Sequence, residues 1–277
     1  MWKIDKPNLS RARGKDVMEL IAHCKELDDS VNEPLKKLYK EYDDQEGFVT
    51  DVQLNAITGE QAQAIHDMYS STYEGKALAF IKDELTSKVY KCPYCSINQP
   101  NTLDHYMPKS NYPALAVCRM NLVPMCGVCN NYKGAKPYTN FIHCYYEKWP
   151  IGSPFLVAKV YVANQRFVVK FCFDSAAIAD ATLEAKLVYQ EKEIRLFERM
   201  RKEATVFINT LCRDCEQNDT PSLKLWLGRR LCDKESECGK NDWRCAIIRG
   251  MLAYPKLDIA QVMYNKVNAK RVNAGGV

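Results

Sequence analysis

The strongest constraint on the fold of this chain is a pair of cysteine motifs, each with two residues between its cysteines. The motifs are Cys92-Pro-Tyr-Cys95 and Cys126-Gly-Val-Cys129, and 30 residues, 96–125, separate them. A C-x2-C turn directs two thiolates to one point, so two such turns supply the four ligands of a tetrahedral zinc ion. Four thiolates leave no open coordination position. The spacing therefore predicts a structural zinc site, with four buried structural cysteines as the simpler alternative.

The cysteine content of the whole chain favours metal binding over disulfide formation. The chain has 277 residues, 13 of them cysteines, and residues 1–10 lack the apolar stretch of a secretory signal. We therefore expect a reducing, cytoplasmic setting, where paired cysteines bind metal more often than they form disulfides. No apolar run reaches the ~18–20 residues that span a bilayer, so the sequence argues against a membrane protein. A hydrophobic fraction of 47% argues against wholesale disorder.

Charge and composition divide the chain into three predicted regions. Residues 1–88 carry 12 Lys and Arg against 17 Asp and Glu, and their apolar periodicity predicts a helical N-terminal region. Residues 89–150 carry 6 against 2 and contain six cysteines, which indicates a small metal-organised module. Residues 151–277 carry 21 against 15 and predict a β-hairpin followed by a helical region. The basic middle and C-terminal regions are compatible with contacts to phosphate.

Local patterns predict the elements within these regions. Apolar spacing favours helices over 16–27 and 77–85, Pro34 can open a helix, and Thr58 to Gln61 fits a capping box. Val- and Phe-rich strands are expected over 155–162 and 166–173, with a turn at 163–165. Further helices are expected over 182–213, from Pro221, and over 242–252, before a loose tail at 270–277.

The residues between the cysteine motifs indicate a function. Asp104-His105 is followed by Pro108, Lys109 and Ser110; Asn121-Leu-Val-Pro precedes the second motif; and Asn130-Asn-Tyr-Lys133-Gly follows it. In this order and spacing, residues 89–137 resemble the HNH nucleases, the ββα-metal group. The resemblance implies an α+β fold, with a ββα-metal core and structural zinc between helical N- and C-terminal regions. It also implies metal-dependent hydrolysis of phosphodiester bonds, with DNA the favoured substrate and RNA an alternative.

The same resemblance assigns roles at the active site. His105 matches the general base, since a neutral imidazole can take a proton from water at physiological pH. Asp104 matches an oxygen ligand of a divalent cation, with Mg²⁺ expected or Mn²⁺ in its place. Asn130 stands where the family name has its final histidine, and we expect its carbonyl oxygen to complete the metal site. Its neighbour Asn131 is the alternative ligand if the helix register shifts.

Three further residues match the family pattern. Asn121 matches the middle asparagine, which joins the loop between the strands and orients the histidine. Lys133, one turn after Asn130, is placed for a phosphate contact. Lys109 is a second candidate for such a contact, although a solvated surface lysine is an equal alternative.

The remaining cysteines give weaker signals. Cys212-Arg-Asp-Cys215, with Cys232 and Cys238 downstream, could form a second zinc site, but the later spacing of five matches no zinc motif. Most of the others are expected to be small buried hydrophobic side chains.

The flanking sequence contains no recognisable DNA-reading motif and no ATPase phosphate loop, so targeting is expected to come from a partner. The arrangement, including Asn241-Asp-Trp-Arg in the C-terminal region, resembles the HNH subunits of bacterial anti-phage defence systems, in particular the PtuB-like subunit of Septu systems, also found with retrons. That resemblance implies an effector nuclease regulated by an ABC/SMC-type ATPase. The alternative is a catalytically inactive, zinc-containing subunit that binds nucleic acid or serves as a scaffold.

Overall fold

The computed structural model describes residues 3–7, 12–150, 152–164, 166–218 and 222–258. The chain is a mixture of helix and sheet, 55% helical, with two small antiparallel hairpins, as the composition and periodicity predict. It divides into two compact units: residues 3–149, called here the N-terminal unit, and the part from Pro150 onward, called the C-terminal unit. Within the described residues, no helix is both long and apolar enough to cross a membrane.

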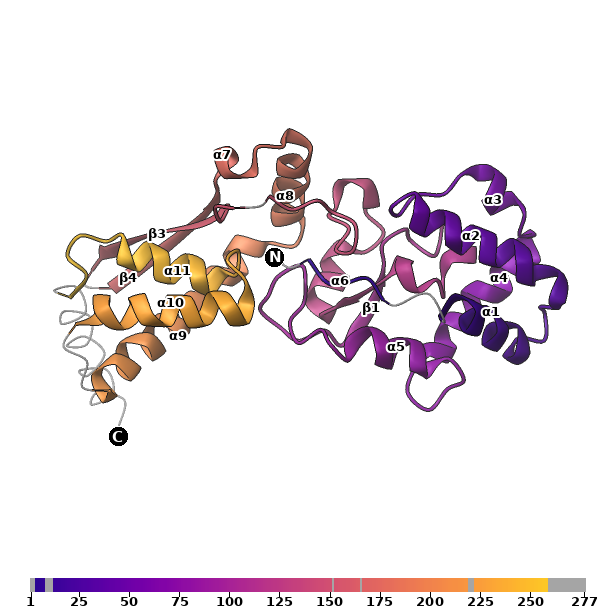
Figure 1. The fold of residues 1–277 in the computed structure, drawn as a ribbon, viewed down its shortest axis with the longest axis horizontal. Helices are drawn as coiled ribbons and strands as arrows, with labels where there is room; N and C mark the ends of the chain where they lie inside the picture. The colour runs from indigo at the N-terminus through magenta and orange to yellow at the C-terminus, as the bar shows by residue number, and fades with distance from the viewer. Residues whose placement is uncertain (1–2, 8–11, 151, 165, 219–221, 259–277) are drawn as a thin grey trace. The chain divides into compact units, whose positions relative to one another are not determined.

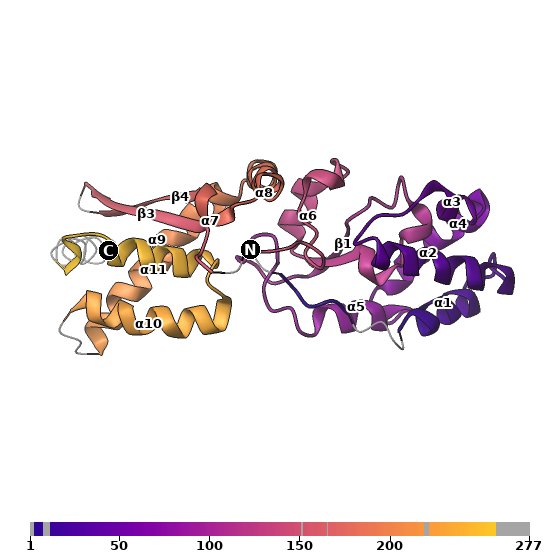
Figure 2. The same cartoon turned by 45° about the horizontal axis from the view of Figure 1, so that its top comes forward.

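The N-terminal unit combines short helices with one small hairpin (Figures 1 and 2). The α-helices are α1 (Ala12–His23), α2 (Asn32–Asp44), α3 (Asp51–Asn55), α4 (Gly59–Met68), α5 (Ala79–Thr86) and α6 (Gly127–Lys133). The strands are β1 (Thr102–His105) and β2 (Leu122–Met125), and single 3-10 turns are η1 (Asp29–Val31), η2 (Tyr69–Thr72), η3 (Pro113–Leu115), η4 (Arg119–Asn121) and η5 (Tyr138–Asn140).

The helices form where the sequence provides an apolar face and a cap. Helix α2 buries Leu35, Leu38 and Tyr42 at helical spacing. Helix α4 begins with the predicted capping box, in which the Thr58 hydroxyl accepts from the Gln61 amide and the Gln61 side chain accepts from the Thr58 amide. The predicted start at residue 16 and end at residue 27 of the first helix both lie about four residues too late, because α1 covers Ala12–His23.

The hairpin lies on the N-terminal helices, and α6 contacts β1. Strands β1 and β2 are antiparallel, with Asp104 opposite Val123 and His105 opposite Leu122, and α6 follows β2 directly. Helix α4 contacts η3, α5 contacts β2, and α2 contacts η4. Arg119 in η4 is buried and forms a two-bond ion pair with Asp16 of α1, with one N–O distance of 2.8 Å. The predicted regions 1–88 and 89–150 therefore pack together as one unit, because the helices cover the small hairpin.

The C-terminal unit contains a longer hairpin covered by helices. Strands β3 (Leu156–Ala163) and β4 (Arg166–Phe173) pair over their full length, as predicted. Helix α11 (Trp243–Leu252) packs on β3, and α9 (Leu196–Gln217) packs on β4. At Gly250 a Cβ atom would lie 2.1 Å from the carbonyl oxygen of Ala158, so only glycine permits this approach of helix and strand. The unit also contains α7 (Ser175–Ile178), α8 (Ala181–Glu193) and α10 (Leu223–Cys238).

The helix predicted over 182–213 is wrong as a single element. It is divided into α8 and α9 at Arg195, whose backbone is left-handed with φ 50°. No glycine or proline marks this break. The predicted helix from Pro221 begins instead at Leu223, and both Pro221 and the predicted tail at 270–277 lie outside the described residues.

Candidate functional site

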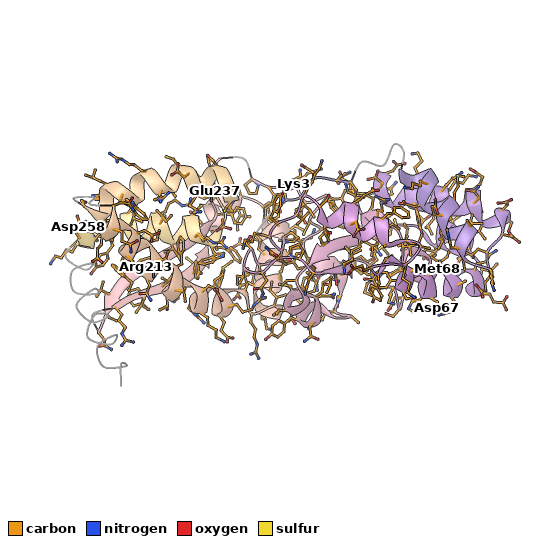
Figure 3. The ribbon with its side chains drawn as sticks, turned by 90° about the horizontal axis from the view of Figure 1, so that it is seen from below. Lys3, Asp67, Met68, Arg213, Glu237 and Asp258 are labelled. Carbon is orange, nitrogen blue, oxygen red and sulfur yellow. The ribbon has the colours of Figure 1, made fainter. Side chains whose placement is uncertain are left out.

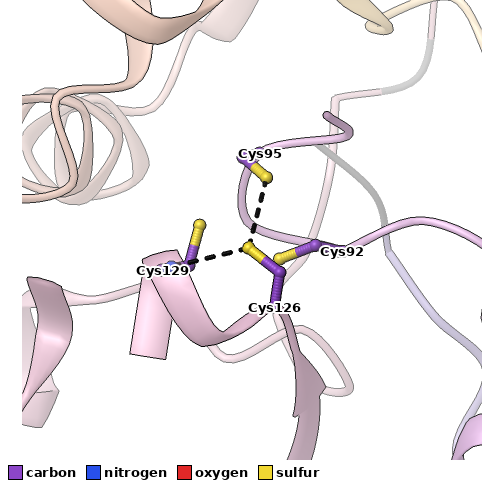
Figure 4. Close-up of side chains that lie close together, drawn as sticks. All are labelled: Cys92, Cys95, Cys126 and Cys129. Carbon is purple, nitrogen blue, oxygen red and sulfur yellow. Dashed lines mark hydrogen bonds between the residues drawn. The ribbon is translucent and has the colours of Figure 1, made fainter. Parts of the chain in front are cut away.

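The four motif cysteines form a buried cluster, in which all four Sγ atoms lie within 4.8 Å of one another (Figure 4). Cys92 and Cys95 come from the loop before β1, and Cys126 and Cys129 come from the start of α6. Such a group of four sulfur atoms could bind a metal ion such as zinc, and it fits the donor set of a structural site.

Local backbone geometry prepares these thiols to bind a cation. The amide of Ile97 donates to Cys95 Sγ at 3.4 Å, and the amide of Cys129 donates to Cys126 Sγ at 3.5 Å. Hydrogen bonds from the thiols of Cys129, Cys92 and Cys95 lower the pKa of the Cys126 thiol, because they favour its thiolate, whereas the pKa values of Cys92 and Cys129 are raised. Since a thiolate is the form that binds metal, Cys126 is poised as a ligand.

The first predicted catalytic pair lies at the end of β1. Asp104 is buried, so its carboxylate needs a positive group beside it to remain ionised. Lys133, the last residue of α6, is fully buried, with its Nζ 2.9 Å from Oδ2 of Asp104 and 2.9 Å from the carbonyl oxygen of His105, to which it donates. Burial raises the pKa of Asp104 to about 6, and Lys133 opposes that rise. In this arrangement Lys133 neutralises Asp104 and does not reach a surface where a phosphate could bind, unlike the predicted role.

The imidazole of His105 is oriented by a backbone carbonyl. Its Nε2 lies 2.9 Å from the carbonyl oxygen of Ala116. Because a carbonyl oxygen can only accept, Nε2 carries the proton of the neutral ring, and Nδ1 keeps its lone pair. Burial lowers the pKa of His105 to about 4, so the ring is neutral at physiological pH. The edge of the ring packs on Tyr69, with ring centres 4.5 Å apart.

Asn121 joins the two ends of the loop that carries Ala116. Its Oδ1 accepts from the amide of Met107 at 2.7 Å, and its Nδ2 donates to the carbonyls of Met107 (3.0 Å) and Leu115 (3.2 Å). The hydroxyl of Tyr42, on α2, donates to the same Oδ1 at 3.1 Å. The hydroxyl oxygen of Tyr42 also lies 3.0 Å from Nε2 of His143, which is buried. His143 therefore helps to hold Tyr42, the residue that donates to Asn121.

Asn130 is held by a network that determines which way its amide faces. The Thr102 hydroxyl donates its single proton to the carbonyl of Met125 at 2.9 Å, so it can only accept from Asn130 Nδ2, at 3.1 Å. The other end of the amide, Oδ1, is therefore the oxygen that remains for a ligand. Asn130 lines a pocket together with Asp104 and His105, whereas Asn131 is exposed on α6.

These residues meet in an open pocket of about 480 Å³, whose floor includes Asp104, His105 and Asn130. Lys109 also lines it, with its Nζ 4.8 Å from the centre of the Tyr69 ring. Another part of the pocket wall comes from the N-terminal helices and the turn after α4, and includes His66, Tyr69, Thr72, Tyr73 and Lys82. These wall residues could not be predicted from the sequence, because no motif connects residues 66–82 with the hairpin.

The second group of cysteines forms no such cluster. Among the described residues, the only group of side chains that could hold a metal ion is formed by the four cysteines of the two motifs. Cys212, Cys215, Cys232 and Cys238 therefore do not gather around one point. Cys212 and Cys215 are buried on α9, whereas Cys232 is exposed on α10. His23 is also remote from the pocket, on the exposed side of α1.

Comparisons of the chain with family models, with curated proteins and with solved structures found no match. The assignment of a function therefore depends on the residues and geometry of this pocket.

Proposed function

We propose that the chain is a metal-dependent endonuclease of the HNH type, which hydrolyses phosphodiester bonds in nucleic acid. The resemblance of residues 89–137 motivates the proposal. The geometry that supports it best is the His105 ring, which lines the pocket while the carbonyl of Ala116 holds its Nε2, so that Nδ1 is the nitrogen without a proton.

In the proposed reaction, His105 Nδ1 takes a proton from the attacking water. The lowered pKa keeps this nitrogen unprotonated at neutral pH, which a general base requires. Asn121 acts as a positioning residue, because it closes the loop whose Ala116 carbonyl orients the ring. The fixed orientation reduces the reorganisation that proton transfer needs.

Asp104 and Asn130 would hold the divalent cation, Mg²⁺ or Mn²⁺. The fit is supported by the side-chain Oδ1 of Asn130, which remains for a ligand because Nδ2 donates to Thr102, and by the carboxylate of Asp104, where the ion would compete with the Lys133 ammonium 2.9 Å away. Both are hard oxygen donors, which such cations prefer. When bound, the ion offsets negative charge that develops on the phosphate.

The four-cysteine cluster has a separate, structural role in this proposal. It joins the loop before β1 to the start of α6 and so connects the segments that carry Asp104 and Asn130. A zinc ion with four thiolate ligands has no open position for substrate.

Plasmid cleavage by wild-type protein and His105→Ala tests the proposal, with Mg²⁺ or Mn²⁺ present. We expect the variant to lose at least about 100-fold in cleavage rate, the usual contribution of a general base. His23→Ala is the matched control, since His23 is exposed and lies outside the pocket. Equal cleavage by wild type and His105→Ala, with zinc retained in both, would support the alternative of an inactive nucleic-acid-binding or scaffold subunit.

The proposed role in anti-phage defence, with an ABC/SMC-type ATPase partner, depends on the looser resemblance. Co-purification with the product of a neighbouring ATPase gene tests it. Cleavage that requires the partner supports a regulated effector, whereas separate elution of the two proteins argues against one.

A further inference from the structure

The part of the pocket wall that comes from the N-terminal helices presents an aromatic side chain to solvent. Tyr73 follows η2, and 51% of its surface is exposed. Among the described residues, it is the only one of the large, exposed hydrophobic side chains that lines this pocket. Since about half of Tyr73 is exposed and does not pack in the core, its ring is available to a ligand.

The ring of Tyr73 is connected to the proposed general base by one further aromatic residue. Tyr73 packs edge-on against Tyr69, with ring centres 5.9 Å apart, and Tyr69 packs edge-on against His105 at 4.5 Å. Tyr69 is buried, and its hydroxyl donates to the carbonyl of Leu103 on β1 at 2.8 Å. Tyr69 is thus fixed to β1, the strand that carries Asp104 and His105. Tyr73 is held in turn by its ring contact with Tyr69.

The turn that carries both tyrosines is well supported. The hydroxyl of Thr72 donates to the carbonyl of Tyr69 at 2.8 Å, and the amide of Tyr73 donates to Ser70. The turn follows directly after Asp67 and Met68, the last residues of α4, which Figure 3 labels. The aromatic wall is therefore anchored at both ends, by α4 and by β1.

Two lysines give the same pocket a positive rim. Lys82, on α5, and Lys109, in the loop after β1, both line the pocket and are only partly exposed. The carboxylate of Asp104 is already neutralised by Lys133. A volume of about 480 Å³ lies within the ~300–1,000 Å³ range of small-ligand sites, so it accommodates a nucleotide.

We propose that Tyr73 stacks on an unpaired base next to the scissile phosphate, so that the preferred substrate is single-stranded or locally unpaired nucleic acid. This inference depends on the proposed function for the position of the phosphate. An exposed aromatic ring beside lysines is the combination that binds single strands, where the ring stacks on a base and the cations contact the backbone. In an intact duplex the faces of the bases are covered by their neighbours, which leaves Tyr73 nothing to stack on.

Binding assays with uncleaved probes test this inference independently of catalysis. The probes are a fluorescein-labelled oligothymidylate of about 20 nucleotides and a hairpin duplex of equal charge, in Mg²⁺-free buffer with the zinc-loaded full chain. We expect Tyr73→Ala to weaken oligothymidylate binding by about 10-fold or more, and to change duplex binding by less than about 2-fold. Tyr73→Phe keeps the ring and should bind as the wild type does.

Tyr90→Ala is the matched control, because Tyr90 is also exposed in the N-terminal unit but lies outside the pocket. The inference is overturned if Tyr73→Ala binds the single strand as tightly as wild type, or if it loses duplex binding equally. It is also overturned if the wild type does not bind the oligothymidylate at low salt. A cleavage assay that fails to implicate His105, combined with the expected loss in Tyr73→Ala, would reject the nuclease proposal and retain the stacking site.

Discussion

The ammonium group of Lys133 lies 2.9 Å from Oδ2 of Asp104, and both side chains are buried. The contact joins the last residue of α6 to β1, and a hydrogen bond from the same ammonium to the carbonyl of His105 strengthens the connection. Lys133 thus balances a buried carboxylate where the proposed cation would bind. The pair is a structural element of the site, and Lys133 would compete with the proposed divalent cation for Asp104.

Lys133→Met should destabilise the protein strongly. The substitution leaves Asp104 buried without a counter-charge, and the loss of one partner of a buried ion pair typically costs about 3–5 kcal/mol of unfolding free energy. Added Mg²⁺ or Mn²⁺ should raise the melting temperature of Lys133→Met more than that of wild type, because the cation replaces the missing ammonium. Thermal unfolding with and without the metal measures both effects.

The double variant Asp104→Asn/Lys133→Met is the control for this interpretation. With both charges removed, most of the stability should return, and added Mg²⁺ or Mn²⁺ should give no extra stabilisation. Lys88→Met, at an exposed position beyond α5, should behave as wild type. A response to metal that is equal in Lys133→Met and in the double variant would show that Asp104 does not hold the cation.

The local chemistry of the site was accessible from the sequence because it is encoded in short segments. The spacing of the cysteine motifs predicted a metal-binding group, and all four thiols lie together. Residues His105 and Asn130, 25 positions apart in the chain, line one pocket. The environment of Lys133 was not predictable, since helical spacing places its backbone near Asn130 but does not reveal that the side chain turns inward to a buried carboxylate.

Long-range packing explains what the sequence could not predict. The Asp16–Arg119 ion pair joins residues 103 positions apart, and nothing local to either residue signals it. Tyr69 and Tyr73 reach the pocket only because α4 packs on η3. Similarly, the break between α8 and α9 depends on the left-handed backbone of Arg195, a residue type that gives no turn signal.

Asn121→Ala should loosen the loop between β1 and β2. The variant leaves the amide and carbonyl of Met107 without their Asn121 partner, and each buried group left unpaired costs about 1–3 kcal/mol. Hydrogen exchange at the Met107 amide should accelerate, and the melting temperature should fall. Asn140→Ala is the control, because that side chain is exposed. Unchanged protection of Met107 would contradict the role of Asn121 as a positioning residue.

Zinc removal should disrupt the N-terminal unit and leave the C-terminal hairpin in place. The cluster joins two loops that no disulfide or long strand connects, and binding energy at a structural zinc site contributes directly to folding. Cys126→Ser should therefore lower the zinc content, measured by metal analysis, and increase hydrogen exchange in β1 and α6. Cys232→Ser, at an exposed position of α10, should retain the wild-type zinc content. Equal zinc content in the two variants would place the metal elsewhere.

The buried imidazole of His105 should make stability depend on pH. Burial lowers its pKa from 6.5 to about 4, so between these values the unfolded chain binds a proton at this residue that the folded chain does not. Its contribution to the unfolding free energy is complete above about pH 6.5 and is lost as the pH falls, by at most ~1.4 kcal/mol per pH unit. Asp104 acts in the opposite direction, because its raised pKa of about 6 makes the folded chain bind a proton at a higher pH than the unfolded chain does.

Urea unfolding of wild type and His105→Asn at pH 7, 6 and 5 separates the two groups, since Asp104 is common to both proteins. The stability of wild type relative to the variant should decline toward pH 5, and a constant difference would mean that His105 is not held neutral by burial.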